Sequence, residues 1–219
     1  MTLNRDPDVV CFKHCGRKFF VFSVPSQCPV CMQAFAQSDE FLPFTLPYPF
    51  VNATQSPCSV VLRSSCGDFL SNFQNSTNLH IALTDSCGSI VEFDSPGLLW
   101  TLSKQVDKAQ WRQCLLIMQV PESWYNEWDQ TLRDVIEKGD WRRRKYDEDR
   151  MNCYSFVLDF LRLLKYEDYA EFVNDRGTFS TNFVVPKTAY AAKYITIFRR
   201  IKECGFWSEI INNCDQQEI

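Results

Sequence analysis

The clearest periodicity of apolar residues lies between residues 149 and 164, in the segment DRMNCYSFVLDFLRLL. Its apolar residues recur at spacings of three, four and five, which predicts a helix with one broad apolar face. These residues are Met151, Phe156, Val157, Phe160, Leu161 and Leu164. Cys153 falls on the same face, because positions 153, 157, 160 and 164 form one stripe along a helix.

The position of Cys153 at the start of this helix makes it a candidate nucleophile. Asp147 or Asp149 is predicted to cap the helix by accepting a hydrogen bond from a backbone N–H. A thiol in the first turn lies at the positive end of the helix dipole, which favours the thiolate. The alternative interpretation is that Cys153 is a small buried apolar residue, as free cysteines often are. A histidine nearby in the fold distinguishes the two.

The segment LHIALTDSCGSIVEFDSPG, from residue 79 to 97, predicts a β-hairpin that contains such a histidine. Its strands are His80–Thr84 and Ser89–Phe93, with a turn at Asp85–Gly88. Glu92 then lies near His80 across the ladder, where it can orient the imidazole and stabilise its protonated form. Asp94 is the alternative orienting group. The competing interpretation is a structural histidine bonded to backbone and an outward-facing Glu92.

The remaining apolar patterns complete an α+β chain. Residues 58–70 predict a short strand and a turn, and residues 111–120 predict a buried strand. Helical periodicity marks two further segments, 122–139 and 184–204, each of which ends at or beside a glycine. We therefore expect an antiparallel sheet with helices packed on it.

Composition and charge limit the classes of partner. The chain has 219 residues, 45% of them hydrophobic, with 18 phenylalanines and 6 tryptophans, which is enough for a well-filled core. The net charge is −4, so we expect no nucleic acid partner. The basic run at residues 141–145 is followed at once by Asp147, Glu148 and Asp149, which indicates a solvated, self-compensating loop.

The cysteines and the first residues indicate the compartment. Residues 1–8 contain no apolar segment typical of a secretory signal, and no apolar run approaches the ~20 residues of a membrane span. Eleven cysteines, an odd number without a signal, favour a reducing compartment with thiol or metal chemistry. We expect an intracellular protein, cytoplasmic or nuclear, with no membrane span.

Four of the cysteines form two close pairs near the amino terminus. Cys11 and Cys15 flank one side of a β-rich stretch, and Cys28 and Cys31 flank the other. Two thiolate pairs brought together across a hairpin can supply the tetrahedral sulfur site that zinc prefers, and four protein ligands would make that zinc structural. The first pair is one residue longer than the usual spacing, and His14 offers a substitute ligand. The alternative is four incidental cysteines.

These patterns divide the chain into four segments. We expect a zinc-ribbon-like hairpin at 1–36, a strap rich in proline and aromatic residues at 37–57, an α+β domain at 58–209 and a polar tail at 210–219. Proline at the density found in 37–57 excludes regular helix and interior strand, while its aromatics distinguish it from a free linker.

The order of a histidine strand, a strand with a second polar residue and a helix that opens with Asn-Cys resembles the circularly permuted papain-like families. These include the lecithin–retinol acyltransferase group and the permuted deubiquitinase-like peptidases, related to the NlpC/P60 hydrolases. The matching residues are His80, Glu92 and the segment NCYSFV at 152–157. The resemblance covers about residues 78–164 and implies a papain-like fold for residues 58–209. It departs from the family in one place, because the third position is often histidine and here is Glu92.

The resemblance also implies a chemistry. Cys153 as thiolate would attack an acyl or amide carbonyl, His80 would share and return the proton, and Glu92 would orient His80. The chain would then be a thiol hydrolase or acyltransferase acting on an acyl or peptide substrate that the sequence does not identify. The rival hypothesis is a catalytically inactive protein-interaction module with a structural zinc ribbon. The whole chain also resembles the makorin opposite-strand family, which brings no activity with it.

Overall fold

The computed structural model describes residues 6–35, 42–74 and 76–211. The chain is α+β, with two antiparallel sheets and several helices, as the apolar periodicity predicts. It divides into two compact units, one formed by residues 1–48 together with 192–219 and the other by residues 49–191. The division point falls inside one helix, α4 (Val185–Cys204).

The first unit contains a four-stranded sheet in the order β3-β1-β2-β9. Its strands are β1 (Val10–His14), β2 (Arg17–Val21), β3 (Phe44–Thr45) and β9 (Trp207–Ile210). A two-residue turn joins β1 to β2, and both of its residues have positive φ, 42° at Cys15 and 71° at Gly16. This backbone geometry matches the twist of a tight hairpin, so the hairpin expected near the amino terminus is confirmed.

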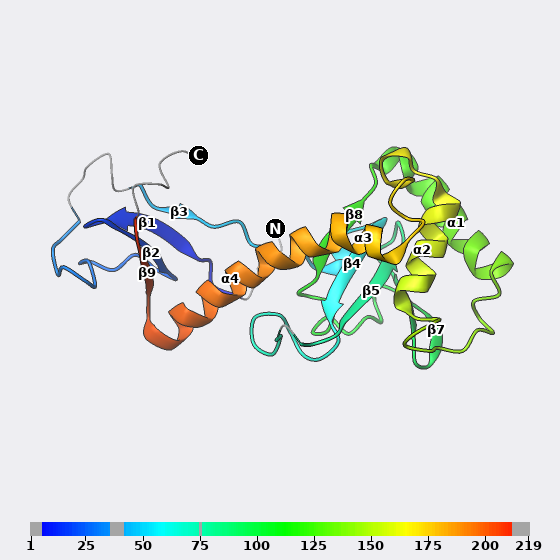
Figure 1. Ribbon diagram of the computed structural model, residues 1–219, viewed down its shortest axis with the longest axis horizontal. Coiled ribbons are helices and arrows are strands. Elements are labelled where there is room, and N and C mark those ends of the chain that lie inside the picture. The colour runs from blue at the N-terminus through cyan, green and yellow to red at the C-terminus, as the bar shows by residue number, and fades with distance from the viewer. Residues whose placement is uncertain (1–5, 36–41, 75, 212–219) are drawn as a thin grey trace. The chain divides into compact units, whose positions relative to one another are not determined.

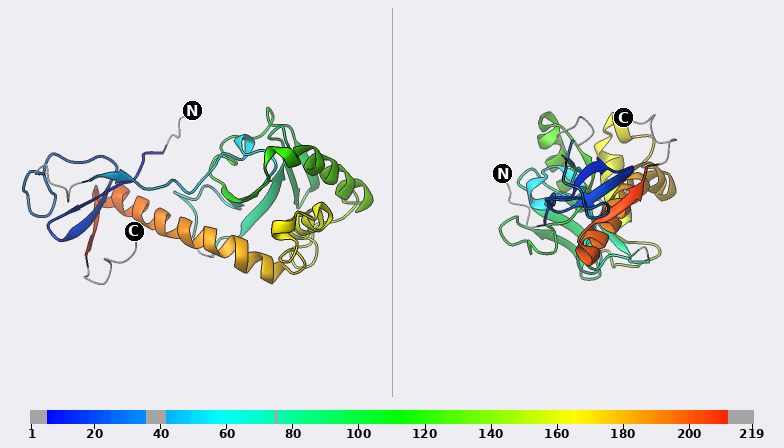
Figure 2. Two further views of the ribbon diagram at one scale, coloured as in Figure 1. Left: turned by 90° about the horizontal axis from the view of Figure 1, so that it is seen from above. Right: turned by 90° about the vertical axis from the view of Figure 1, so that its left-hand side faces the viewer.

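Strand β9 belongs to this sheet although it comes from the other end of the described chain. It pairs antiparallel with β2, with Arg17 facing Ile210 and Phe20 facing Trp207. Figure 2 shows the blue amino-terminal strands beside the red carboxy-terminal strand. The sequence pattern did not predict this strand, because four residues carry too little periodicity. Most of the predicted polar tail, residues 212–219, lies outside the described residues.

The proline-rich segment is held by backbone pairing where the structure describes it. Its strand β3 pairs with β1, and Val51 forms an isolated bridge with Cys114. Phe50 is buried against the stacked ring of Phe69. The boundary between the two units falls within this segment, after Tyr48, so its two halves serve different units.

The second unit is built on a five-stranded sheet in the order β7-β6-β5-β4-β8 (Figure 1). Its strands are β4 (Ser59–Ser64), β5 (Leu79–Thr84), β6 (Ile90–Asp94), β7 (Gly97–Thr101) and β8 (Leu115–Gln119). The predicted hairpin is confirmed as β5 and β6. Asp85 organises its turn, since the Asp85 Oδ1 accepts hydrogen bonds from the N–H groups of Cys87 and Ser89.

Helices cover one face of this sheet, and a loop residue packs on the other. Helix α2 (Cys153–Leu164) packs on β5 and β6, and helix α1 (Tyr125–Lys138) packs on α2. The indole N–H of Trp128 on α1 donates to the Thr84 carbonyl at 2.9 Å, which ties α1 to the end of β5. On the other face, Trp111 from the loop between β7 and β8 packs against strand residues of the core such as Ala82.

Short helical turns connect these elements. They are η1 (Ala53–Gln55), η2 (Glu122–Trp124), η3 (Glu167–Tyr169), α3 (Arg176–Phe179) and η4 (Ser180–Val184). Two helices end at the glycines predicted for them, because α1 is capped by Gly139 and α4 is followed by Gly205 with φ +80°. Within the described part of the chain, every helix is too short or too polar to cross a membrane.

Gly88 in the β5–β6 turn is expected to be essential to the hairpin. It has φ +73°, and an added Cβ would lie 2.2 Å from the Thr54 carbonyl oxygen. Gly97 is the matched control, because it has φ +103° and no heavy atom within 4 Å of an added Cβ. We expect Gly97→Ala to cost about 1–2 kcal/mol through backbone strain alone. Gly88→Ala adds overpacking against backbone and is expected to cost roughly 2–4 kcal/mol.

Urea unfolding of the two variants measures this difference. Equal losses of unfolding free energy in Gly88→Ala and Gly97→Ala would show that the close approach of Thr54 does not constrain the turn.

Candidate functional site

The three residues predicted to form the thiol site converge in the second unit. Cys153 opens α2, His80 is the second residue of β5, and Glu92 is the third residue of β6. All three are buried, with 5%, 4% and 8% of their surface exposed. The structure therefore brings together every member of the predicted set.

Glu92 is the carboxylate that forms a hydrogen bond with His80. The His80 Nε2 lies 2.7 Å from the Glu92 Oε2, a hydrogen bond within the buried part of the sheet. Asp94, the alternative orienting group, has a carboxylate oxygen within 4.8 Å of the same atoms and accepts a hydrogen bond from the Ser95 N–H. Because Nε2 is engaged with Glu92, Nδ1 is the ring nitrogen that remains for the thiol.

The thiol meets the imidazole where β5 and β6 separate. Their ladder joins only Leu83 to Val91 and Thr84 to Ile90, so the strands part before they reach His80 and Glu92. His80 shares the Trp111 face of the sheet, whereas α2 packs on the opposite face. The opening places the Ile81 N–H and the His80 imidazole near the Cys153 sulfur, where both favour the thiolate.

The cap of α2 differs from the predicted one. Asn152 is the N-cap, not Asp147 or Asp149, and its side chain accepts from the N–H groups of Tyr154 and Ser155. The Ser155 hydroxyl in turn accepts from the Asn152 N–H at 3.3 Å, which completes a capping box. Asp147 instead orders the preceding turn by accepting from the N–H of Asp149. This box fixes the first helical residue as Cys153.

The electrostatics of the site favour a thiolate paired with an imidazolium. Burial lowers the pKa of His80, but hydrogen bonds and charges from Cys153 and Glu92 outweigh it and raise that pKa to about 9. Burial raises the pKa of the Cys153 thiol, but the hydrogen bond and charge of His80, with the N–H groups of Ile81 and Tyr154, lower it below the usual range. Each group thus stabilises the charged form of the other.

Two residues that the sequence analysis missed complete the surroundings. The Arg63 Nη2 on β4 lies 3.8 Å from the Glu92 Oε2, and Arg63 is buried. Tyr146 lies near the Cys153 sulfur, and burial together with the charge of that sulfur raises the pKa of Tyr146 to about 12. The arginine inside the apolar segment VVLRSS could have indicated that Arg63 belongs to the site, since a charge in a buried strand needs a partner. Nothing in the local sequence marked Tyr146.

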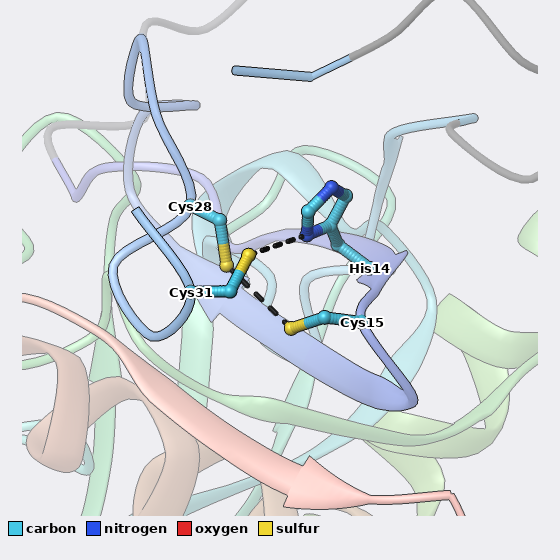
Figure 3. Close-up of side chains that lie close together, drawn as sticks. All are labelled: His14, Cys15, Cys28 and Cys31. Carbon is cyan, nitrogen blue, oxygen red and sulfur yellow. Dashed lines mark hydrogen bonds between the residues drawn. The ribbon is translucent and has the colours of Figure 1, made fainter. Parts of the chain in front are cut away.

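A second cluster of ligating side chains lies in the first unit. His14, Cys15, Cys28 and Cys31 place one ligand atom each within 4.8 Å of the others, an arrangement that could hold a metal ion. Figure 3 shows these side chains pointing toward one another, with the Cys15 and Cys28 sulfurs 3.7 Å apart and the His14 Nδ1 3.6 Å from the Cys31 sulfur. His14 is the last residue of β1, Cys15 lies in the tight turn that follows, and the loop after β2 supplies the other two ligands.

Three of the four predicted metal ligands are therefore together, and the fourth is replaced. Cys11 lies apart from the cluster, fully buried and paired in register with Phe20 and Phe44. Side chains alternate along a strand, so Cys11 and His14 lie on opposite faces of β1. His14 takes the ligand position that the sequence analysis assigned to Cys11, and Cys15 remains a candidate ligand as predicted.

Comparison with known proteins gives a family for the whole chain. Residues 43–201 match the DUF4796 C-terminal family, and residues 7–35 match the DUF4796 N-terminal family. The chain belongs to the DUF4796 family. A similar relative is the MKRN2 opposite strand protein of Homo sapiens, 31% identical over 211 residues, which are 94% of this chain and 90% of the relative. The resemblance to the makorin opposite-strand family is thereby confirmed.

No solved structure matches this DUF4796 chain. The two family matches divide the sites between them. The DUF4796 N-terminal match contains the His14, Cys15, Cys28 and Cys31 cluster, and the DUF4796 C-terminal match contains Cys153, His80 and Glu92. Each site lies within one family segment and within one structural unit.

The coupling between Cys153 and His80 predicts a pH-dependent reactivity. We expect iodoacetamide to alkylate Cys153 at neutral pH, at a rate that falls as the pH drops through the lowered pKa of the thiol. In His80→Ala, only the N–H groups of Ile81 and Tyr154 still oppose the effect of burial, so the thiol pKa rises. The rate at pH 7 is then expected to fall by at least about tenfold, because each unit of pKa changes the thiolate fraction about tenfold.

Mass spectrometry of the peptide that carries Cys153 follows this alkylation in time. The exposed Cys66 on the same chain is the internal reference, and its rate is expected to be the same in both proteins. If the rate of Cys153 alkylation is the same in His80→Ala as in the wild type, the predicted coupling between the two residues is wrong.

Proposed function

We propose that the chain is a thiol-dependent hydrolase or acyltransferase, and that its second unit is a circularly permuted papain-like domain. The observation that carries this proposal is the buried row formed by the Cys153 sulfur, the His80 imidazole and the Glu92 carboxylate. A helix that opens with the cysteine packs on adjacent strands that carry the histidine and the acid, which is the arrangement that the sequence resemblance implies.

The reaction would proceed in two steps. The Cys153 thiolate attacks the carbonyl carbon, a carbon–sulfur bond forms, and the bond to the leaving group breaks as the His80 imidazolium gives the leaving group a proton. Neutral His80 then takes a proton from water, or from an acceptor alcohol or amine, which attacks the thioester. The product leaves and the thiolate–imidazolium pair returns. Glu92 holds the ring in one orientation throughout.

Two groups near the sulfur would act as donors for the oxyanion that forms in each step. The Asn152 cap uses the N–H groups of Tyr154 and Ser155, which leaves the N–H of Cys153 itself as the unused donor of that turn. Tyr146 lies near the sulfur, and its hydroxyl would be a second donor. Two preorganised donors are the usual minimum of an oxyanion site.

A small activated ester tests the proposal directly. We expect p-nitrophenyl acetate to acetylate Cys153 and release nitrophenolate, with no acetylation at that position in Cys153→Ala. Glu92→Gln is expected to slow acetylation by about a hundredfold, the lower end of the range typical for loss of an acid–base group. Asp94→Asn is the matched control two residues along the same strand and is expected to act within about twofold, since Asp94 does not hold the imidazole in its hydrogen bond.

Mass spectrometry locates the acetyl group, and absorbance follows nitrophenolate. The hydrolase proposal would be falsified if acetylation of Cys153 proceeded equally in the wild type and in His80→Ala.

A second candidate function has its own observation. We propose that the first unit is a zinc ribbon that serves as a protein-interaction module. In a tetrahedron with zinc–sulfur bonds of about 2.3 Å and a zinc–nitrogen bond of about 2.0–2.1 Å, the sulfur–sulfur edge is about 3.8 Å and the nitrogen–sulfur edge about 3.6 Å. The edges found for Cys15–Cys28 and His14–Cys31 are 3.7 and 3.6 Å. Four ligands fill the coordination sphere, so the zinc would be structural.

Exposed apolar side chains gather in the same unit. They are Val24, Val30, Met32, Leu42, Phe44 and Ile210. Val30 and Met32 flank the ligand Cys31, so the turn that would bind zinc also presents apolar surface. Such surface in a small metal-stabilised unit favours contact with another protein.

Metal analysis of purified protein tests the ligand set. We expect about one zinc per chain in the wild type and in Cys11→Ser, because Cys11 lies outside the cluster. His14→Ala removes one of four ligands and is expected to lower zinc affinity by several orders of magnitude at constant free zinc, since each ligand bond contributes to folding of the site. Elemental mass spectrometry after dialysis gives the ratio. If His14→Ala keeps its zinc and Cys11→Ser loses it, the ligand is Cys11, as the sequence predicted, and not His14.

A further inference from the structure

We propose that Arg63 is a positioning residue of the thiol site: its guanidinium shares the Glu92 carboxylate with His80 and thereby allows the imidazole to release its proton during acyl transfer. The inference rests on the proposed thiol function and adds to it a fourth member that acts through Glu92. Its test reads the ionisation of His80 and needs no turnover.

The geometry of three neighbouring strands carries this inference. Arg63 on β4 lies directly opposite His80 on β5 in the strand register. Its Nη2 lies 3.8 Å from the same Glu92 oxygen, Oε2, that bonds to the His80 Nε2 at 2.7 Å. One carboxylate oxygen therefore faces two cationic groups, one permanently charged and one titratable.

Arg63 is held in place without being fully satisfied. Its guanidinium lies 4.8 Å from the centre of the Trp111 ring, and its Nη1 donates to the Ser64 carbonyl at 3.1 Å. Its Nε is buried and has no hydrogen-bond partner among the described residues. A buried charge with an unsatisfied donor is costly to a fold. Stability alone thus does not account for Arg63 in this strand, and the adjacent carboxylate does.

The charge balance of the reaction shows what Arg63 contributes. In the resting site Arg63, Glu92, His80 and Cys153 alternate in sign and sum to zero. When the thioester forms, Cys153 loses its negative charge and His80 loses its proton, and Arg63 with Glu92 still sum to zero. Without Arg63, proton release would leave a buried Glu92 carboxylate beside a neutral imidazole. His80 would then retain its proton and would fail as acid and as base.

Other titratable groups near the site keep a constant charge over the relevant range or can be controlled. Burial and the Cys153 charge raise the pKa of Tyr146 to about 12, and burial raises the pKa of Cys114, next to Arg63, to about 12, so both are mostly neutral below about pH 11. Asp94 on β6 adds a carboxylate oxygen that lies within 4.8 Å of the His80 ring nitrogen and the Glu92 carboxylate oxygen. Its contribution is removed by measuring every variant in the Asp94→Asn background as well.

The expected effect is a higher pKa for His80 when the charge of Arg63 is removed. Because both groups contact Glu92 Oε2, at 3.8 and 2.7 Å, the Arg63 Nη2 and the His80 Nε2 are at most about 6.5 Å apart. Loss of a positive charge at that distance favours protonation of the imidazole, by about 0.5 to 2 in pKa for an effective dielectric between about 80 and 20. The shift is upward from a value near 9.

Nuclear magnetic resonance of the imidazole rings tests this, and the chain has only two histidines, His14 and His80. We expect Arg63→Met and Arg63→Gln to raise the His80 pKa by at least about 0.5, and Arg63→Lys, which keeps the charge, to leave it within about 0.3. The His14 resonances are the internal control.

An unchanged His80 titration in a folded Met or Gln variant overturns the inference. So does failure of both variants to fold while Arg63→Lys folds, because that result assigns Arg63 to the stability of the sheet. If Cys153 proves unreactive toward the ester and the His80 shift is still found, the proposed function fails and the role of Arg63 in the charge balance stands.

Discussion

Four buried ionisable side chains in a row are the constraint on which the second unit depends. Arg63, Glu92, His80 and Cys153 alternate in sign, and each contacts its neighbour in the row. Burial penalises every one of these charges, so each is stable only beside its opposite. The row draws on β4, β5, β6 and α2, and no two adjacent members come from the same element. The strand order β6-β5-β4 and the docking of α2 are therefore requirements of the site as well as features of the fold.

The backbone brings the thiol at the start of α2, on one face of the sheet, close to the His80 imidazole on the other face. The short β5–β6 ladder leaves a gap at the residues of the candidate site, and the Ile81 N–H at this gap helps to lower the pKa of the thiol. The Asn152–Ser155 capping box starts α2 at Cys153, so the thiol enters the gap at a defined position. A helix that started a few residues earlier would carry this sulfur into a later turn, away from the helix terminus.

The parts of this site that could be predicted are those that depend on local pattern. Helical periodicity identified Cys153 at the start of α2, and the hairpin register placed Glu92 near His80. Arg63 was not identified, because its partner lies on a strand more than twenty residues away and only the strand order brings them together. The cap was misassigned because Asp147, Asp149 and Asn152 are all good capping residues and periodicity does not fix a helix start to one position.

The same distinction applies to the first unit. The two cysteine pairs indicated a metal site, but the face of β1 that lines it depends on where the turn falls, and a turn at Cys15 and Gly16 selects His14 over Cys11. Strand β9 was missed because its pairing with β2 joins residues almost two hundred positions apart. The most direct test of the buried charge row is the ultraviolet absorbance of thiolates at neutral pH, compared between the wild type and Cys153→Ala. The account predicts that the substitution removes one thiolate from the spectrum, whereas spectra that coincide at neutral pH and separate only in alkali would contradict it.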